Sequence, residues 1–115
     1  MKLAVVGSRT FKDLERLSNE LDSIHAETPI KLIVSGGAAG ADSLAERWAQ
    51  LNCVETQIFL PDWKQLGRGA AVIRNRQIIE ACAQCIAFWD GESKGTRHSI
   101  ELAKKMGKRV KTILF

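Results

Sequence analysis

Apolar and polar residues alternate in blocks along this chain, and the short apolar blocks predict strands. Five such runs occupy Lys2–Val6, Ile30–Val34, Val54–Leu60, Cys85–Trp89 and Val110–Phe115. Runs of this length bounded by glycine, proline or polar residues are typical of buried strands. Because the runs are apolar throughout, we expect a parallel sheet covered on both faces.

Helical patterns fill the intervals between these runs. Leu14, Leu17, Leu21 and Ile24 recur at helical spacing, and Thr28-Pro29 ends that helix. Three further helices are predicted over Ala41–Asn52, Ala70–Cys82 and Thr96–Met106, and Gly107 caps the last of them. Two polar loops are predicted over Pro61–Gly69 and Asp90–Gly95.

This alternation predicts a single α/β domain over residues 1–115, a three-layer Rossmann-like fold with right-handed crossovers. In such folds a ligand binds beyond the carboxyl ends of the strands, where the strand order reverses. The unusual segments all fall at those ends: Gly7–Thr10, Ser35–Asp42, Pro61–Gly69 and Asp90–Thr96. We therefore expect them to form one site.

Composition narrows the class of protein. The 115 residues are 45% hydrophobic and 26% charged, which suits one ordinary globular core, and no stretch is long enough to cross a membrane. Three cysteines and no export signal predict a cytoplasmic protein with reduced thiols. The net charge of +4 favours anionic partners, such as nucleotides or nucleic acid.

The segment from Ser35 to Asp42 is the most informative. Its glycines, Gly36, Gly37 and Gly40, stand between a predicted strand and a predicted helix. Such a turn aims backbone N–H groups at an anion, which predicts a phosphate-binding loop. The alternative is that the glycines serve only the geometry of the turn.

Side chains at the other strand ends suit the same ligand. Gly7-Ser8-Arg9 offers a turn, a hydroxyl and a cation that can hold phosphate in two hydrogen bonds. Ser93-Lys94-Gly95-Thr96 opens a helix and predicts a second anion site or a helix cap. In Arg74-Asn75-Arg76, one arginine can face the ligand and the other Glu80. Asp42 is expected to cap its helix or to bind a ribose hydroxyl.

Aromatic residues give candidates for stacking on a base. Trp63 lies in a predicted loop and is the first candidate, with Phe11 and Trp89 as alternatives. Trp48 is expected in the core.

No metal site and no cofactor are predicted. The spacing of Cys82 and Cys85 fits a metal site, but no second pair or nearby histidine completes it. His25 and His98 are isolated, and we expect them to be exposed on helices.

The ordered set of motifs resembles a known family. It consists of Gly7-Ser8-Arg9, Ser35-Gly36-Gly37-Ala38-x-Gly40-x-Asp42, Asp62-Trp63, Arg74-Asn75 and Ser93-Lys94-Gly95-Thr96. It resembles the YspA-like, YpsA-related branch of the SLOG superfamily, which is named for the Smf/DprA and Lonely Guy proteins. The resemblance implies a Rossmann-like sheet of order 3-2-1-4-5 and a nucleotide or nucleotide-derived ligand, bound in some members for sensing.

Relatives within the superfamily imply two alternatives. Lonely Guy enzymes are phosphoribohydrolases acting on nucleoside monophosphates, and their signature places a glutamate where this chain has Ser99. The nearest glutamate, Glu101, is rotated by roughly 200° on the helix, so Glu92 and Asp90 (and Asp62) are the other candidate catalytic carboxylates. DprA proteins bind single-stranded DNA, and related families often dimerise, so weak binding of single strands and a homodimer are expectations here.

Overall fold

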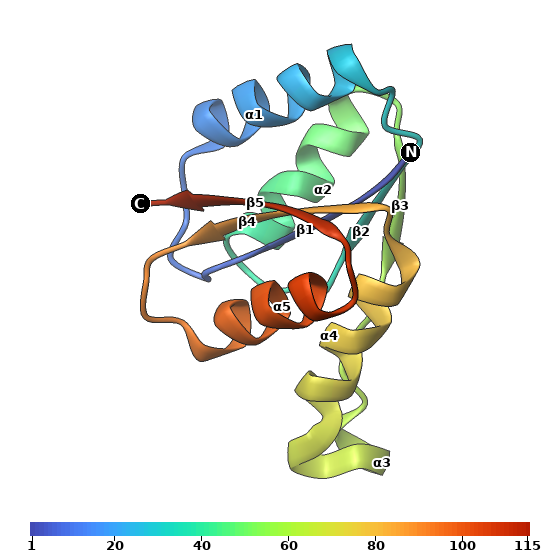
Figure 1. The fold of residues 1–115 in the computed structure, drawn as a ribbon, viewed down its shortest axis with the longest axis vertical. Coiled ribbons are helices and arrows are strands. Elements are labelled where there is room, and N and C mark those ends of the chain that lie inside the picture. The colour runs from blue at the N-terminus through green and yellow to red at the C-terminus, as the bar shows by residue number, and fades with distance from the viewer.

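Five parallel strands form the centre of the molecule in a computed structural model that describes residues 1–115 (Figure 1). They are β1 (Lys2–Gly7), β2 (Leu32–Ser35), β3 (Glu55–Ile58), β4 (Gln84–Trp89) and β5 (Arg109–Leu114). Their order is β3-β2-β1-β4-β5, which confirms the order implied by the resemblance. The strands β1 and β4 are therefore neighbours, with Val5 opposite Ile86.

Helices cover both faces of the sheet. On one face lie α1 (Leu14–Glu27) and α2 (Ala41–Leu51), and on the other lie α4 (Ala70–Ala81) and α5 (Lys94–Lys105) (Figure 1). This is the three-layer arrangement that the alternating pattern predicts. None of the helices combines the length and the apolar composition needed to cross a lipid bilayer.

Each face of the sheet has its own hydrophobic core, because successive residues of a strand point to opposite sides. Leu3 and Val5 of β1 pack with α1 and α2, in a cluster that includes Trp48. Ala4 and Val6 of the same strand belong to the cluster beneath α4 and α5. The expectation that Trp48 lies in the core is confirmed, and its indole Nε1 donates to Asp22 at 2.9 Å.

Local signals set the ends of the helices. The Asp13 carboxylate accepts a hydrogen bond from the backbone N–H of Arg16 at 3.0 Å and caps α1. Ser93 caps α5, which therefore begins at Lys94 rather than at Thr96. At the other end of α5, Met106 is the C-cap, and Gly107 follows it with a positive φ of 73°.

The predicted loop Pro61–Gly69 differs from the structure. It contains a short helix, α3 (Trp63–Leu66), and a 3₁₀ turn, η1 (Gly67–Gly69). Asp62 caps α3 by accepting from the backbone N–H of Gln65 at 3.2 Å, a turn-scale signal that apolar periodicity does not detect. Figure 1 shows α3 and the beginning of α4 projecting beyond the sheet.

The strand β3 also departs from the expectation of uniformly covered strands. It is shorter than the predicted Val54–Leu60, and all four of its residues are exposed. The reason is its place at the edge of the sheet, where only β2 pairs with it.

Candidate functional site

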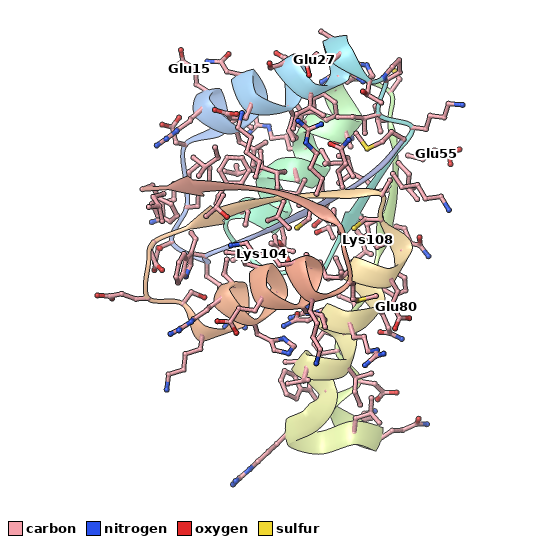
Figure 2. The ribbon with its side chains drawn as sticks, viewed as in Figure 1. Glu15, Glu27, Glu55, Glu80, Lys104 and Lys108 are labelled. Carbon is pink, nitrogen blue, oxygen red and sulfur yellow. The ribbon has the colours of Figure 1, made fainter.

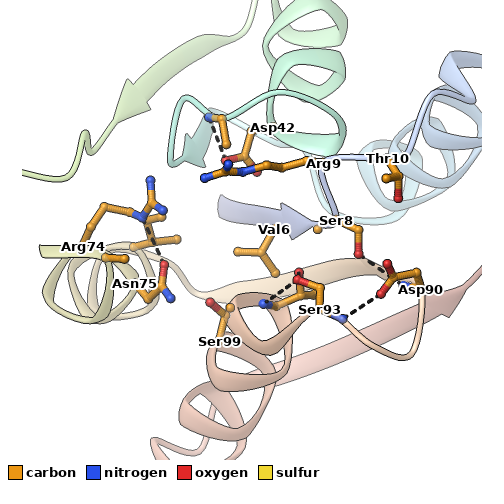
Figure 3. Close-up of a pocket in the computed structure, with 16 residues that line it drawn as sticks. Val6, Ser8, Arg9, Thr10, Asp42, Arg74, Asn75, Asp90, Ser93 and Ser99 are labelled. Carbon is orange, nitrogen blue, oxygen red and sulfur yellow. Dashed lines mark hydrogen bonds between the residues drawn. The ribbon is translucent and has the colours of Figure 1, made fainter. Parts of the chain in front are cut away.

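A polar cavity of about 430 Å³ opens where β1 and β4 end (Figure 3). This is the switch point of the sheet, because β2 lies on the far side of β1 and β5 on the far side of β4. Of the sequence-predicted ligand residues, the ones that line it are Gly7, Ser8, Arg9, Asp42, Arg74, Asn75, Ser93, Gly95 and Thr96. The structure thus brings together residues from three of the four expected segments and from α4.

Six lining residues were not among the ligand candidates named from the sequence. Thr10 and Ala38 lie within segments that were expected to form the site, and the others are Val6, Ala71, Ile78 and Ser99. A periodic signal exists for α4, since Ala71, Arg74, Asn75 and Ile78 follow the spacing of a single helix face. Ser99 likewise lies one turn after Thr96 on α5. A search for helix faces that begin at strand ends would have found these positions.

Hydrogen bonds join the two loops beside the cavity. The Ser8 backbone N–H donates to the Phe88 carbonyl at 2.9 Å, and its hydroxyl accepts from the Asp90 backbone N–H at 3.3 Å. The Asp90 carboxylate accepts from the backbone N–H groups of Ser93 at 2.8 Å and of Glu92 at 2.9 Å. These two bonds are the main reason that the pKa of Asp90 lies below its usual range. Asp90 thus holds the loop as a carboxylate.

The N-terminus of α5 presents donors to the cavity. The Ser93 hydroxyl caps the helix at the Thr96 backbone N–H, 3.4 Å away, and also contacts the Thr96 hydroxyl at 3.1 Å. The backbone N–H groups of Lys94 and Gly95 have no acceptor within the protein. Free donors in the first turn of a helix favour an anion.

Arg74 and Asp42 form the opposite wall (Figure 3). Arg74 donates through Nη1 to the Gly36 carbonyl at 2.7 Å and through Nε to the Asn75 side-chain oxygen at 3.0 Å. Asp42 accepts from the Ala38 backbone N–H at 3.2 Å. Burial, which leaves only 7% of Asp42 exposed, raises its pKa to about 6 against the opposing pull of the Ala38 N–H and of Arg74.

Arg9 is the free cation of the cavity. Its side chain is exposed, and it forms neither a hydrogen bond nor an ion pair within the protein, whereas the ion pairs of the chain join other residues. Burial lowers the pKa of Arg74, the Asp42 carboxylate opposes this shift, and the neighbouring positive charge of Arg9 adds to it. Two guanidinium groups therefore repel each other across a space that an anion can fill.

The glycine turn itself lies differently from the expectation. Gly36, Gly37 and Gly40 do not line the cavity, because protein atoms occupy the space beside them. A Cβ on Gly36 would meet Arg74 Nη1 at 2.6 Å, and one on Gly37 would meet Leu60 at 2.7 Å. The Gly37 backbone N–H already donates to the Ser35 hydroxyl at 3.3 Å.

This placement agrees with the alternative interpretation, in which the glycines serve the geometry of the turn. The Asp42 carboxylate accepts from an N–H group of this turn, where a bound anion was expected. Because Gly36 has no side chain, the guanidinium of Arg74 fits beside it. Ser35 is fully buried away from the cavity, where its hydroxyl donates to Glu46 at 3.3 Å. The open donors are those of the second predicted anion site, at the N-terminus of α5.

The stacking candidates lie outside the cavity. Trp63 begins α3, is 56% exposed and is absent from the cavity wall. Phe11 is buried against Phe88, with ring centroids 4.7 Å apart, so it has no free face. Trp89 is half-buried and donates to the Ser93 carbonyl at 3.0 Å.

Among the candidate carboxylates, only Asp90 reaches the cavity wall. Glu92 is exposed and does not line it, nor does Lys94. Glu101 pairs with Arg97 on the outer surface of α5 at 3.1 Å, because a shift of two residues turns it away from Ser99. Asp62 caps α3, outside the cavity.

Arg76 and the two histidines interact with neighbouring residues of the protein. Arg76 pairs with Glu80 at 2.7 Å, as expected for the arginine that turns away from the site. The expectation of exposed histidines is wrong, since both are half-buried. His25 accepts from the Ile30 backbone N–H at 2.8 Å, and His98 lies 3.5 Å from the Asn75 amide.

The cysteines form no bond with one another. Cys82 and Cys85 are buried thiols, and burial raises the pKa of each. No group of three or more histidine, cysteine or acidic residues is arranged to hold a metal ion.

Comparison with known proteins places this geometry in a family. A model of the YspA, cpYpsA-related SLOG family matches residues 1–66. The Gene 61 protein of Mycobacterium phage D29 is 36% identical over 113 residues, which is 92% of this chain and 90% of that protein.

Solved structures show the same fold. DNA processing protein A (DprA) from Streptococcus pneumoniae superposes with a TM-score of 0.79 at 24% identity, over 96% of this chain and 49% of DprA. DprA from Helicobacter pylori, described for its single-stranded DNA binding mode, superposes with a TM-score of 0.76 at 22% identity. The match covers 97% of this chain and 64% of that DprA chain. This chain thus spans less than two thirds of either DprA chain. On its sequence, the chain belongs to the YspA, cpYpsA-related SLOG family.

Proposed function

We propose that the cavity binds a nucleotide or a nucleotide-derived ligand through its phosphate group. The observation that carries this proposal is the convergence of an unpaired guanidinium, Arg9, with unpaired N–H groups at the start of α5. A phosphate accepts hydrogen bonds from both kinds of donor, and a guanidinium can hold two of its oxygens. The phosphate would also screen Arg9 from Arg74.

The opposite wall suits a sugar. Asp42 lines the cavity, and carboxylates accept from ribose hydroxyls in dinucleotide-binding folds. The hydroxyls of Thr10 and Ser99 add polar contacts, while Val6 and Ile78 give an apolar floor. A volume of about 430 Å³ lies within the range of small-molecule sites, roughly 300–1,000 Å³. The site therefore supports a ligand of mononucleotide size.

The substitution Arg9→Ala tests this proposal. Loss of a charge-assisted hydrogen bond to phosphate should cost about 1.5–3 kcal/mol, which is a rise in Kd of roughly 10- to 150-fold. Isothermal titration with purine nucleoside monophosphates measures this change. Arg76→Ala removes the same charge from a residue that pairs with Glu80 outside the cavity, and should leave the Kd unchanged. Equal affinities for the wild type and Arg9→Ala would contradict the proposal.

A second candidate function is binding of single-stranded DNA, which the fold similarity to DprA favours. In this case the same donors would hold the phosphates of a strand. Affinity that rests on several phosphates falls steeply with salt, because counterions are released on binding. A mononucleotide in the cavity uses few charges and should bind with a smaller salt dependence.

Titration of both ligands at low salt and at about 0.3 M salt separates the two functions, since the Debye length there is shorter than the roughly 8 Å at physiological strength. We expect mononucleotide binding to persist at high salt and oligonucleotide binding to be largely lost. Tight oligonucleotide binding at high salt, without mononucleotide binding, would establish the DprA-like function instead.

A further inference from the structure

Most of the buried polar side chains of the protein lie around the cavity. The chain buries six polar or charged side chains, and five of these six line the cavity, namely Ser8, Asp42, Asn75, Thr96 and Ser99. Charged side chains elsewhere, such as Glu15, Glu80 and Lys104, extend from the helices into solvent (Figure 2). Burial of a polar group is unfavourable unless the group forms hydrogen bonds. The concentration of such groups in one cavity therefore indicates a ligand with several polar groups of its own.

Ser99 offers the cavity a free hydroxyl. The residue is only 3% exposed, and its hydroxyl forms no hydrogen bond within the protein. Every buried side-chain nitrogen or oxygen of the chain has a hydrogen-bond partner, so the Ser99 oxygen must be an accessible atom. Since Ser99 lines the cavity, this oxygen is accessible from the cavity (Figure 3).

Asn75, on the facing helix α4, also keeps a free hydrogen-bonding group. Its side-chain oxygen accepts from Arg74 Nε at 3.0 Å, which fixes the orientation of the amide. Its nitrogen lies 3.5 Å from His98 Nδ1 and carries two hydrogens, so one of them remains for a ligand. Asn75 can thus donate, and Ser99 can donate or accept. This combination matches the hydroxyl groups of a sugar.

The spacing along α5 indicates which part of the ligand meets Ser99. Ser99 follows Gly95, whose free N–H belongs to the proposed phosphate site, by four residues, or about 6 Å along the helix. In a nucleotide the group bonded to the phosphate is the sugar. A sugar beside the first turn of α5 can therefore contact Ser99, while its C–H groups pack on Val6 and Ile78.

The cavity wall offers no ring on which a base could stack. None of the 16 lining residues is aromatic. Trp63 lies elsewhere, and Phe11 is buried against Phe88. Stacking on an aromatic side chain strengthens the binding of a base by roughly 5- to 150-fold, which corresponds to about 1–3 kcal/mol. The lining of this cavity does not supply that contribution.

We infer that the cavity recognises the phosphate and the sugar of its ligand but not the base, so that its ligands are pentose phosphates with or without a base. This inference rests on the proposed function, because a phosphate held by Arg9 and by the start of α5 is what places the sugar beside Ser99 and Asn75.

Isothermal titration of the whole chain with inorganic phosphate, ribose 5-phosphate, AMP and UMP tests the inference. Ribose 5-phosphate should bind at least about fivefold more tightly than inorganic phosphate, because hydrogen bonds to the sugar add to those of the phosphate. AMP and UMP should bind within about fivefold of ribose 5-phosphate, since a stacked base would add fivefold or more.

The possible failures are distinguishable. If AMP or UMP binds more than about fivefold more tightly than ribose 5-phosphate, the base is recognised. The inference is then overturned, while the proposed nucleotide site stands. If ribose 5-phosphate gains less than about fivefold over inorganic phosphate, the sugar is not recognised and the inference is again overturned. Absence of binding by all four compounds would contradict the proposed function and this inference with it.

The substitution Ser99→Ala tests the contact with the sugar. It should raise the Kd of ribose 5-phosphate and of AMP alike, by roughly 2- to 12-fold, and leave the Kd of inorganic phosphate unchanged. Because the Ser99 hydroxyl has no partner within the protein, its removal should preserve the fold. Ser23→Ala is the matched control, since Ser23 is exposed on α1 outside the cavity and should change none of these values. Equal weakening of inorganic phosphate by Ser99→Ala, or no weakening of ribose 5-phosphate, would overturn the inference.

Discussion

Replacement of Asp42 by asparagine should stabilise the protein at neutral pH. The wild-type carboxyl is buried, and its pKa is raised from 3.8 to about 6, mainly because burial disfavours the charged form. The native state therefore holds a proton on Asp42 in a range where the unfolded chain has lost it. Stability must fall as the pH rises through this window and must level off above pH 6. Asparagine is neutral at every pH and avoids this loss.

The size of the effect follows from the two pKa values. Ionising Asp42 costs the native state about 1 kcal/mol at pH 4.5 and about 3 kcal/mol at pH 7, relative to the unfolded chain. The advantage of Asp42→Asn should thus grow by about 2 kcal/mol between these pH values. Other titrating groups are common to both proteins and cancel in the difference.

Urea unfolding of both proteins at pH 4.5 and pH 7 measures this difference, provided that the slope with denaturant is unchanged. Asp62→Asn is a suitable control, because Asp62 is an exposed helix cap and asparagine caps about as well as aspartate. It should show no such dependence on pH. An advantage for Asp42→Asn that stays constant or reverses at pH 7 would refute the reasoning. The attraction of Arg74 and the Ala38 N–H would then outweigh burial.

Three further predictions concern single positions and the chemistry. Gly40→Ala should lower the free energy of unfolding, measured with denaturant, by about 2 kcal/mol or more, because φ is 81° and a Cβ would overlap the backbone of Ser8 and Arg9. Gly95→Ala is the control and should not destabilise the fold in this way, because the space beside Gly95 is open. Ser93→Ala should lower the free energy of unfolding by about 1 kcal/mol through loss of the α5 cap. Incubation with purine nucleoside monophosphates should release little free base, as measured by chromatography. Turnover of about 1–1,000 per second would instead show that the protein is a hydrolase, and Asp90 would then be the first carboxylate to replace.

The sequence pattern was sufficient to predict the layers of the fold, but it did not show which strand lies at the edge of the sheet. Apolar runs and helical spacing identify strands and helices because burial selects them directly. The pattern cannot show that β3 lies at the edge, since Val54–Leu60 contains enough apolar residues to resemble a covered strand. The exposure of Ile58 and Leu60 follows from the absence of a further strand or helix beyond β3.

The candidate site was predictable in location more than in detail. Parallel strands bring their following loops to one edge, so the grouping of Arg9, Ser93 and Thr96 follows from topology. The role of the glycine turn depended on a residue 38 positions away, since Arg74 occupies the space beside Gly36. Such a contact between distant segments has no local signal in the sequence. The same holds for the hydrogen bond between Asp90 and Ser8.

The interior is divided into two cores on opposite faces of the sheet, and each core contains side chains whose signal changes when that core becomes exposed to solvent. Trp48 lies in the cluster with α1 and α2, so in a variant with Trp63 and Trp89 replaced by phenylalanine the remaining fluorescence reports on that layer. Cys82 and Cys85 lie in the cluster with α4 and α5, and burial raises the pKa of both thiols, so alkylation requires that layer to open. Cys53 is exposed and should react at once. Comparing the slow labelling of the other two thiols with the fluorescence change would reveal whether the layer carrying Arg74 separates from the sheet before the rest of the molecule unfolds.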